Sequence, residues 1–159
     1  GAHTDAPSHY LTDGVGIDAR DLSLYMGQCQ VVCASTPRGE RIQLSHVKTP
    51  IHAPRVLFRT GSFPDPDTFN EDFSSLSPDL IDALAKQGVR LVGIDTPSID
   101  PLNSKELPSH AAVARNDMAI LEGIVLDHVE EGTYTLVALP LRLEHGDASP
   151  VRAVLVDDQ

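Results

Sequence analysis

The sequence predicts an α/β domain with a mixed β-sheet and a few flanking helices. Several short, apolar, β-branched runs are typical of strands. One segment, 77–88, has the capping residues and apolar spacing of an amphipathic helix. An apolar run follows that segment at once, and such a helix-to-strand step is typical of an α/β unit. The length of 159 residues suits a single domain, 1–159, with a hydrophobic core of its own.

The first half of the chain alternates short extended runs with polar loops. "GAHTDAP" is expected to be extended before a turn, because Pro7 restricts Ala6 to extended backbone. "QCQVVCAS" and "RVLFRT" are expected strands, separated by a polar segment, "GERIQLSHVKTPIHAP", that holds a loop and a short helix. "GSFPDPDTFNEDFSSL" is rich in Pro, Asp and Ser, which predicts a long surface loop and a candidate lid.

The helix at 77–88 is the clearest element of the second half. Ser77 can cap it, Pro78 occupies its first position and Gly88 ends it. "VRLVGID" then has the composition of a buried strand. A second helix is expected from about Ser109, in "SHAAVARND". Further strands are expected in "MAILEGIVLD", "TYTLVALPLRL" and "SPVRAVLV".

The acidic composition disfavours two classes of partner. The formal net charge is −11 and the sequence has no cluster of Lys and Arg, so neither a nucleic-acid groove nor an anionic membrane surface is expected. No apolar run approaches the roughly 20 residues of a membrane span. Cys29 and Cys33 are too few for a disulfide framework and are expected to be two small buried thiols, which favours a reducing, cytoplasmic compartment.

The opening stretch, "GAHTDAPSHY", gathers residues that bind metals or move protons. His3 and Asp5 are two residues apart, so in an extended segment both side chains point to the same side. An imidazole and a carboxylate placed in this way can converge on one metal ion or bridge two. His9 lies beyond the turn at Pro7, where a free imidazole suits a general acid or base. The alternative is a solvated polar turn that is rich in histidine.

A second pair of candidate ligands lies far along the chain. Glu122 stands in the apolar run "AILEGIVL", and a buried carboxylate needs an arginine, a proton or a metal. The alternative to a metal is a salt bridge to Arg115 or Arg142. His110 lies near the start of the second expected helix, whose positive end disfavours imidazolium and leaves the neutral ring that a metal requires. The alternative for His110 is an exposed position.

The remaining candidates carry weaker signals. Asp95 ends a buried strand in "GIDTPSID", where it either lines a site at the strand end or caps its own turn. Four other histidines are expected to be solvated: His46, His52, His128 and His145. The sequence has no glycine-rich phosphate loop, no G-x-S-x-G elbow and no C-x-x-C pair, so the chemistries that depend on those motifs are not indicated.

Several of these stretches together resemble one family. "GAHTDAPSHY" resembles the motif His-x-Gly-Thr/Ala-His-x-Asp-x-Pro-x-His of the metal-dependent cyclase/formamidase family. "LVGIDTPSIDPLNSK", "HAAVARNDMAILEGIVLDHV", "GTYTLVALPLRL" and "DASPVRAVLV" are similar to the corresponding stretches of its bacterial kynurenine formamidases, or arylformamidases. The resemblance implies a swivelling β/β/α domain that is usually a homodimer and holds two zinc ions per subunit.

The resemblance also implies a role for each matching residue. Four residues are implied as metal ligands: His3, Asp5, His110 and Glu122. Asp5 would bridge the two ions, and His9 matches the general acid/base. The motif's first histidine would stand two residues before Gly1, and the family's upstream N-terminal segment is absent from this sequence.

The activity implied by the resemblance is hydrolysis of N-formyl-L-kynurenine to L-kynurenine and formate, a step of tryptophan degradation by the kynurenine pathway. Two alternatives stay open. One is a related metal-dependent hydrolase of another amide, such as a cyclic amide of the isatin type. The other is a non-catalytic binding protein with a degenerate metal site. Hydrolysis rates on a panel of amides distinguish the first alternative from the formamidase. The second alternative predicts little tightly bound metal and no hydrolysis.

Overall fold

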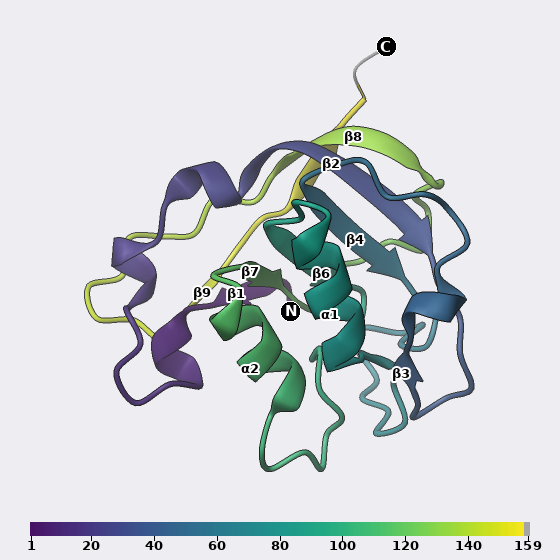
Figure 1. The fold of residues 1–159 in the computed structure, drawn as a ribbon, viewed down its shortest axis with the longest axis horizontal. Helices are drawn as coiled ribbons and strands as arrows, with labels where there is room; N and C mark the ends of the chain where they lie inside the picture. The colour runs from purple at the N-terminus through teal and green to yellow at the C-terminus, as the bar shows by residue number, and fades with distance from the viewer. Residues whose placement is uncertain (158–159) are drawn as a thin grey trace.

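The structure, a computed structural model, describes residues 1–157 and contains a six-stranded mixed sheet with two α-helices on one face (Figure 1). In sheet order the strands are β10 (Val154–Val156), β8 (Gly132–Val137), β2 (Met26–Cys33), β4 (Arg55–Arg59), β6 (Leu91–Ile94) and β7 (Ala119–Leu121). The neighbours from β2 to β7 are parallel, whereas β8 is antiparallel to both β2 and β10. The α/β class with a mixed sheet is therefore confirmed.

Two short ladders lie outside this sheet. In one, β1 (His3–Asp5) pairs antiparallel with β9 (Ala148–Pro150). In the other, β3 (Arg41–Ile42) pairs parallel with β5 (Ser75–Leu76). The described chain also has short 3₁₀ turns at Pro7–His9, Ile17–Ala19, Leu22–Leu24 and Leu44–His46.

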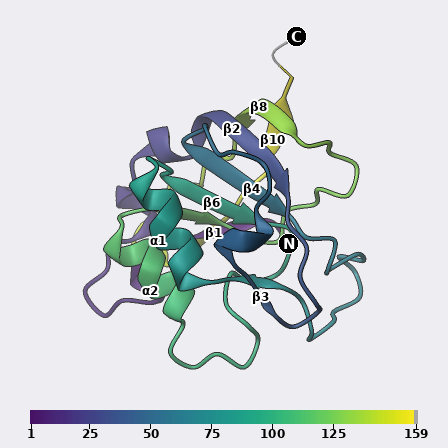
Figure 2. The ribbon, with the colours of Figure 1, turned by 45° about the vertical axis from the view of Figure 1, so that its right-hand side comes forward.

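Helices α1 (Pro78–Lys86) and α2 (Pro108–Arg115) lie side by side on one face of the sheet (Figures 1 and 2). The Oγ of Ser77 accepts the backbone N–H of Leu80, which satisfies a donor that the first turn of α1 leaves free. The apolar stripe of α1 is completely buried against the sheet: Leu80, Ile81 and Leu84. Gly88 ends the helix with a φ of 90°, a backbone conformation that glycine adopts without strain. The expected cap, stripe and stop are all confirmed.

Three expected strands are shorter than the sequence pattern indicates. Of 118–127 only β7 is regular strand, because Gly123 turns the chain with a φ of 65°. The strand expected over 133–143 is β8, and it ends at Val137, which is paired with Met26, the first residue of β2. The run 149–156 is divided between β9 and β10, which pair with different partners. For β8, β9 and β10 the partner strand, which the local sequence does not contain, decides where the strand ends.

The parallel strands place several polar side chains at one edge of the sheet. β2 ends at Cys33 and β4 at Arg59, while Asp95 and Glu122 directly follow β6 and β7. β1 joins this edge, since His3 and Glu122 exchange two backbone hydrogen bonds of 3.0 and 2.9 Å. In open α/β sheets the carboxyl ends of the strands are where ligands bind.

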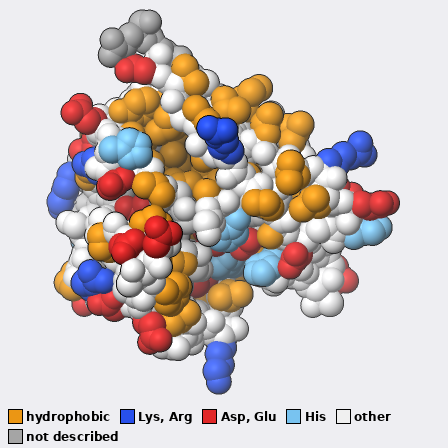
Figure 3. Space-filling model, turned by 180° about the vertical axis from the view of Figure 1, so that it is seen from behind, with side chains coloured by type: hydrophobic (Ala, Val, Ile, Leu, Met, Phe, Trp, Pro, Cys, Tyr) orange, Lys and Arg blue, Asp and Glu red, His pale blue; other side chains and the backbone are white. Residues whose placement is uncertain are grey.

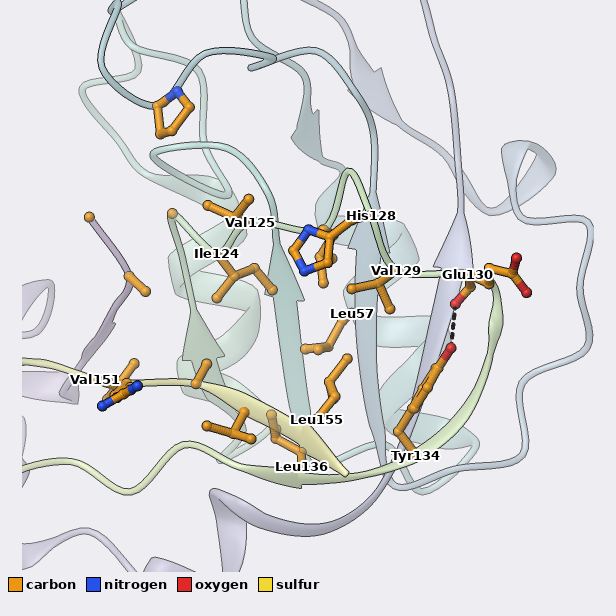
Figure 4. A pocket seen from close by; sticks show the side chains of 18 of the residues that line it. Leu57, Ile124, Val125, His128, Val129, Glu130, Tyr134, Leu136, Val151 and Leu155 are labelled. Carbon is orange, nitrogen blue, oxygen red and sulfur yellow. Dashed lines mark hydrogen bonds between the residues drawn. The ribbon is translucent and has the colours of Figure 1, made fainter. Parts of the chain in front are cut away.

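The face of the sheet that helices α1 and α2 do not cover carries an apolar hollow of about 970 Å³. It is lined by side chains from β4, β8 and β10, including Leu57, Leu136 and Leu155 (Figure 4). Figure 3, which shows the molecule from behind, has hydrophobic side chains gathered beside a group of histidine and acidic side chains near the centre. Within residues 1–157, neither α-helix has the length and apolar character needed to cross a bilayer.

Candidate metal centre

The first strand and the segment after β7 bring two expected ligand pairs together. His3 and Asp5 lie on the same side of β1, as their spacing predicts, and the backbone bridge to Glu122 fixes the glutamate beside them. The ligand atoms of His3, Asp5 and Glu122 all lie within 4.8 Å of one another. His110, in the first turn of α2, completes the group from the helix side. The expected burial of Glu122 is confirmed, since only 2% of it is exposed.

Each carboxylate stands between the two imidazoles. The Oδ1 of Asp5 is 3.6 Å from the Nε2 of His3, and its Oδ2 is 3.7 Å from the Nε2 of His110. The Oε2 of Glu122 is 3.2 Å from the Nε2 of His3, and its Oε1 is 3.6 Å from that of His110. This arrangement offers two neighbouring positions, each with one imidazole nitrogen and one oxygen from each carboxylate.

The donor set fits a metal ion in both chemistry and spacing. Ligands about 2.1 Å from a tetrahedral zinc ion stand roughly 3.4 Å apart, and the nitrogen–oxygen distances of this group are close to that value. Within residues 1–157, the ion pairs of Asp5 and Glu122 are all with imidazoles. Glu122 therefore forms neither alternative salt bridge, to Arg115 or to Arg142, and Arg115 pairs with Asp82 instead.

His110 is held by a buried carboxylate that the sequence did not single out. The Oδ2 of Asp100 is 2.8 Å from the Nδ1 of His110 and also accepts the backbone N–H of that residue. The other oxygen, Oδ1, accepts from the guanidinium of Arg41 at 2.7 Å, and Asp100 is fully buried. A carboxylate on the far nitrogen of a histidine fixes the ring and points its other nitrogen at a metal.

The carboxylates raise the pKa of both histidines. For His3, the hydrogen bond to Glu122 is the main cause, and the pKa rises to about 8. For His110, burial lowers the pKa, but contacts with Asp100 and Asp5 outweigh it and raise the pKa to about 9. Both carboxylates therefore act on the pKa of His110 in the direction opposite to the expected effect of the helix end.

His9 approaches the cluster from the turn after β1. Its Nε2 lies 3.9 Å from the Oδ2 of Asp5, and its Nδ1 is 2.9 Å from the Oδ2 of Asp147. The side chain is 44% exposed, so water and a small substrate can reach it. The sequence carried no signal for Asp147, since its pairing with His9 joins residues 138 positions apart.

A cavity of about 460 Å³ opens beside His3. Asp95 lines this cavity, as one of its two expected roles predicts. It also accepts the backbone N–H groups of Thr60 and Gly61, so the turn that it caps follows β4 and not its own strand, β6. Burial raises the pKa of Asp95.

The residues outside the cluster follow the expectations with one exception. The four other histidines are exposed or partly exposed: His46, His52, His128 and His145. Both thiols are free, as expected, but only Cys29 is buried, whereas Cys33 is partly exposed at the end of β2. The reason is that Cys33 is the last residue of its strand, where packing on both faces no longer continues.

A family model and several solved structures are similar to this chain. The family model described as "Putative cyclase" matches residues 1–101. A solved structure described as a potential metal-dependent hydrolase with cyclase activity is 30% identical, with a TM-score of 0.85 over 98% of this chain and 77% of that one. A predicted metal-dependent hydrolase from Bacillus stearothermophilus is also 30% identical, with a TM-score of 0.79 over 98% and 75%.

More distant matches share the fold. Isatin hydrolase A from Labrenzia aggregata is 22% identical, with a TM-score of 0.74 over 98% of this chain and 72% of that chain. At this identity the likeness concerns the fold alone. The family model and the two structures at 30% identity show that this chain belongs to the cyclase family.

Proposed function

We propose that this protein is a metal-dependent amide hydrolase, an arylformamidase that converts N-formyl-L-kynurenine to L-kynurenine and formate. The observation that carries the proposal is the pair of buried carboxylates, Asp5 and Glu122, each shared by two imidazoles, with a third imidazole at the open side. Membership of the cyclase family and likeness to proteins described as metal-dependent hydrolases support the class of reaction.

The proposed ligands are His3, Asp5, His110 and Glu122, and the proposed metal is zinc, which accepts imidazole nitrogen and carboxylate oxygen. When bound, such an ion lowers the pKa of a water molecule and polarises a carbonyl oxygen. Asp100 and the backbone carbonyl of Gly1 hold the Nδ1 atoms of His110 and His3, so both rings present Nε2 to the carboxylates.

His9 is proposed to move the proton. In hydrolysis a C–O bond forms from water to the formyl carbon, the C–N bond breaks, and the water proton must reach the departing aniline nitrogen. Asp147 fixes the Nδ1 of His9 and leaves Nε2 facing the cluster. From there Nε2 can take the proton from water and deliver it to the nitrogen, which is a poor leaving group until it is protonated.

The test is hydrolysis by the full chain after loading with zinc, with a panel of N-formyl-L-kynurenine, formanilide and isatin. We expect formate release from N-formyl-L-kynurenine, and loss of that release in Glu122→Gln. Glu106→Gln, which changes an exposed glutamate of the same charge, is the matched control and retains activity. Faster ring opening of isatin than deformylation would replace the formamidase with a cyclic amidase, and no hydrolysis of any amide would refute the proposal.

A further inference from the structure

Two cavities adjoin along the carboxyl edge of the sheet. The cavity beside His3 shares Gly61 and Asp127 with a second one, of about 550 Å³, that is lined by Cys33 and Arg59 at the ends of β2 and β4. Neighbouring strands are about 4.8 Å apart, so the edge from β2 to β7 measures roughly 14 Å. The metal cluster is at the β7 end of this edge, and the second cavity is at the β2 end.

The cavity beside His3 is an apolar slot with an aromatic wall. Phe63 and Phe69 both line it, and their rings meet edge to face with centroids 5.8 Å apart, which makes up the aromatic wall. The run Ile124–Leu126 lines the cavity from the segment after β7. Two of these side chains are strongly exposed: Phe69 by 57% and Val125 by 52%. Large apolar side chains that line a cavity and remain exposed to it fit a flat aromatic ring.

The aromatic wall is held in place by hydrogen bonds at the base of its loop. Asp95 accepts from the backbone N–H groups of Thr60 and Gly61 and from the hydroxyl of Thr60. The hydroxyl of Ser62 accepts the N–H of Ser74, which clips the two ends of the loop together. These bonds fix both ends of the loop that carries Phe63 and Phe69, which reduces the conformational freedom that a ligand would have to restrict on binding.

The second cavity concentrates positive charge in an acidic protein. Arg59, Lys48 and His46 line it, although the sequence has 23 Asp and Glu against 12 Lys and Arg. In the part of the chain that the structure describes, neither Lys48 nor Arg59 forms an ion pair with a carboxylate. Lys48 donates to the carbonyl of Ser45, whereas the guanidinium of Arg59 donates to the carbonyl of Val129 and to the Sγ of Cys33. Asp127, at the junction of the two cavities, adds one exposed carboxylate, whose Oδ1 is 3.0 Å from the Nδ1 of His128.

We propose that these joined cavities select an aryl amide that carries an α-amino-acid chain: the slot takes the ring, and the Lys48–Arg59 cavity takes the amino-acid head group. The substrate carboxylate faces Lys48 and Arg59, and the ammonium group faces Asp127. The inference rests on the proposed function for the reacting amide, and it adds the reason why a zwitterionic substrate is preferred to a bare aryl amide.

The test compares two formamides that differ only in the amino-acid group, N-formyl-L-kynurenine and 2-formamidoacetophenone, with the zinc-loaded full chain. The measured quantity is the ratio of the two kcat/KM values. Lys48→Glu should lower this ratio about 10-fold, through KM for N-formyl-L-kynurenine, because it replaces an attraction by a repulsion at the exposed Lys48 position. Lys105→Glu, an exposed lysine that does not line either cavity, should leave the ratio unchanged.

An unchanged ratio in Lys48→Glu would overturn the head-group site while the formamidase activity stood. If neither formamide is hydrolysed, the affinities of the two deformylated products test the head-group site. We expect L-kynurenine to bind at least 5-fold more tightly than 2-aminoacetophenone in calorimetry, and Lys48→Glu to remove that difference. Equal binding of the two ligands by the unmodified protein would overturn the inference whatever the outcome for hydrolysis.

Discussion

At the residue scale, the contact on the Nδ1 atom of each site histidine decides what its ring can do. His3, His9 and His110 all have Nδ1 within 2.9 Å of an oxygen, from a backbone carbonyl or a carboxylate. All three therefore present Nε2 to Asp5 or Glu122. The three Nδ1 partners differ in kind: His3 contacts a backbone carbonyl, and His9 contacts an exposed carboxylate. His110 contacts the fully buried carboxylate of Asp100.

The role of Asp100 can be tested by an isosteric change. Asp100→Asn keeps the shape of the side chain but removes the charge that orients His110, so zinc affinity should fall about 10- to 100-fold. Chelator competition measures the affinity, and Asp72→Asn, which changes an exposed carboxylate paired with Arg38, is the matched control. Unchanged affinity in a folded Asp100→Asn would mean that His110 needs no partner to bind metal.

The role of His9 predicts a different pattern of loss. His9→Ala should lower kcat by about 10²- to 10⁴-fold, because no other group takes over the proton. Zinc content per chain should stay that of the unmodified protein, since His9 is not among the proposed ligands. Elemental analysis beside the formate assay measures both quantities, and near-normal turnover would assign the proton transfer to another group.

The raised pKa values of His3 and His110 predict a pH dependence of metal binding. A protonated imidazole cannot bind a metal, and these rings keep their protons up to pKa values of about 8 and about 9. Zinc affinity should therefore still rise about 10- to 50-fold between pH 7 and pH 8, and should level off above pH 9. Titrations in zinc buffers measure the profile. Rings with ordinary pKa values of about 6.5 would instead give a profile that is flat above pH 7.

At the element scale, the sequence predicted the elements whose signals are local. It did not predict the ends of strands that depend on a distant partner strand. The cap, stripe and stop of α1 all lie within 77–88, so the helix could be located from sequence. The end of β8 at Val137 depends on where β2 begins, and no residue near 137 encodes that. Strand existence was therefore predictable, but strand length was not.

The same distinction applies to the candidate site. His3 and Asp5 could be paired from their spacing, and Glu122 stood out as a carboxylate in an apolar run. Asp100 and Asp147 could not be found in this way, because both lie in polar stretches where a carboxylate is ordinary. Their importance comes only from contacts with His110 and His9 in the fold.

The turn that carries His9 depends on a close approach at Gly14. A Cβ at this position would lie 2.3 Å from the carbonyl carbon of Pro7 and 2.4 Å from the N of Ser8, and these backbone atoms cannot move aside alone. Gly14→Ala should therefore displace the turn, lower stability by about 1–3 kcal/mol and reduce kcat.

Gly132→Ala is the matched control for Gly14→Ala, because its Cβ would meet only Tyr134, at an ordinary 3.5 Å. Thermal unfolding and the formate assay compare the two variants. Equal stability and activity in both would show that the turn at Pro7 adapts without cost to the position of His9.

At the scale of the whole molecule, the candidate metal centre joins the first strand of the chain to two segments of its second half. β1 supplies His3 and Asp5, α2 supplies His110, and the segment after β7 supplies Glu122. β1 pairs with β9 and not with the six-stranded sheet, so the backbone bridge from His3 to Glu122 and the side chains of the cluster are its connections to that edge. A metal ion held by all three segments would link β1 to both α2 and β7.

Metal removal should therefore lower the stability of the whole domain. A ligand at 100 times its Kd stabilises the native state by about 2.7 kcal/mol, which corresponds to roughly 5–10 °C in Tm for a domain of this size. Chelation should lower Tm by this amount, and zinc should restore it. In Glu122→Gln, which loses one proposed ligand charge but keeps an oxygen near the N–H of Ile99, zinc should shift Tm much less. A Tm that does not respond to zinc in the unmodified, folded protein would show that the four side chains hold their arrangement through protons and hydrogen bonds alone, and the metal centre would have to be abandoned.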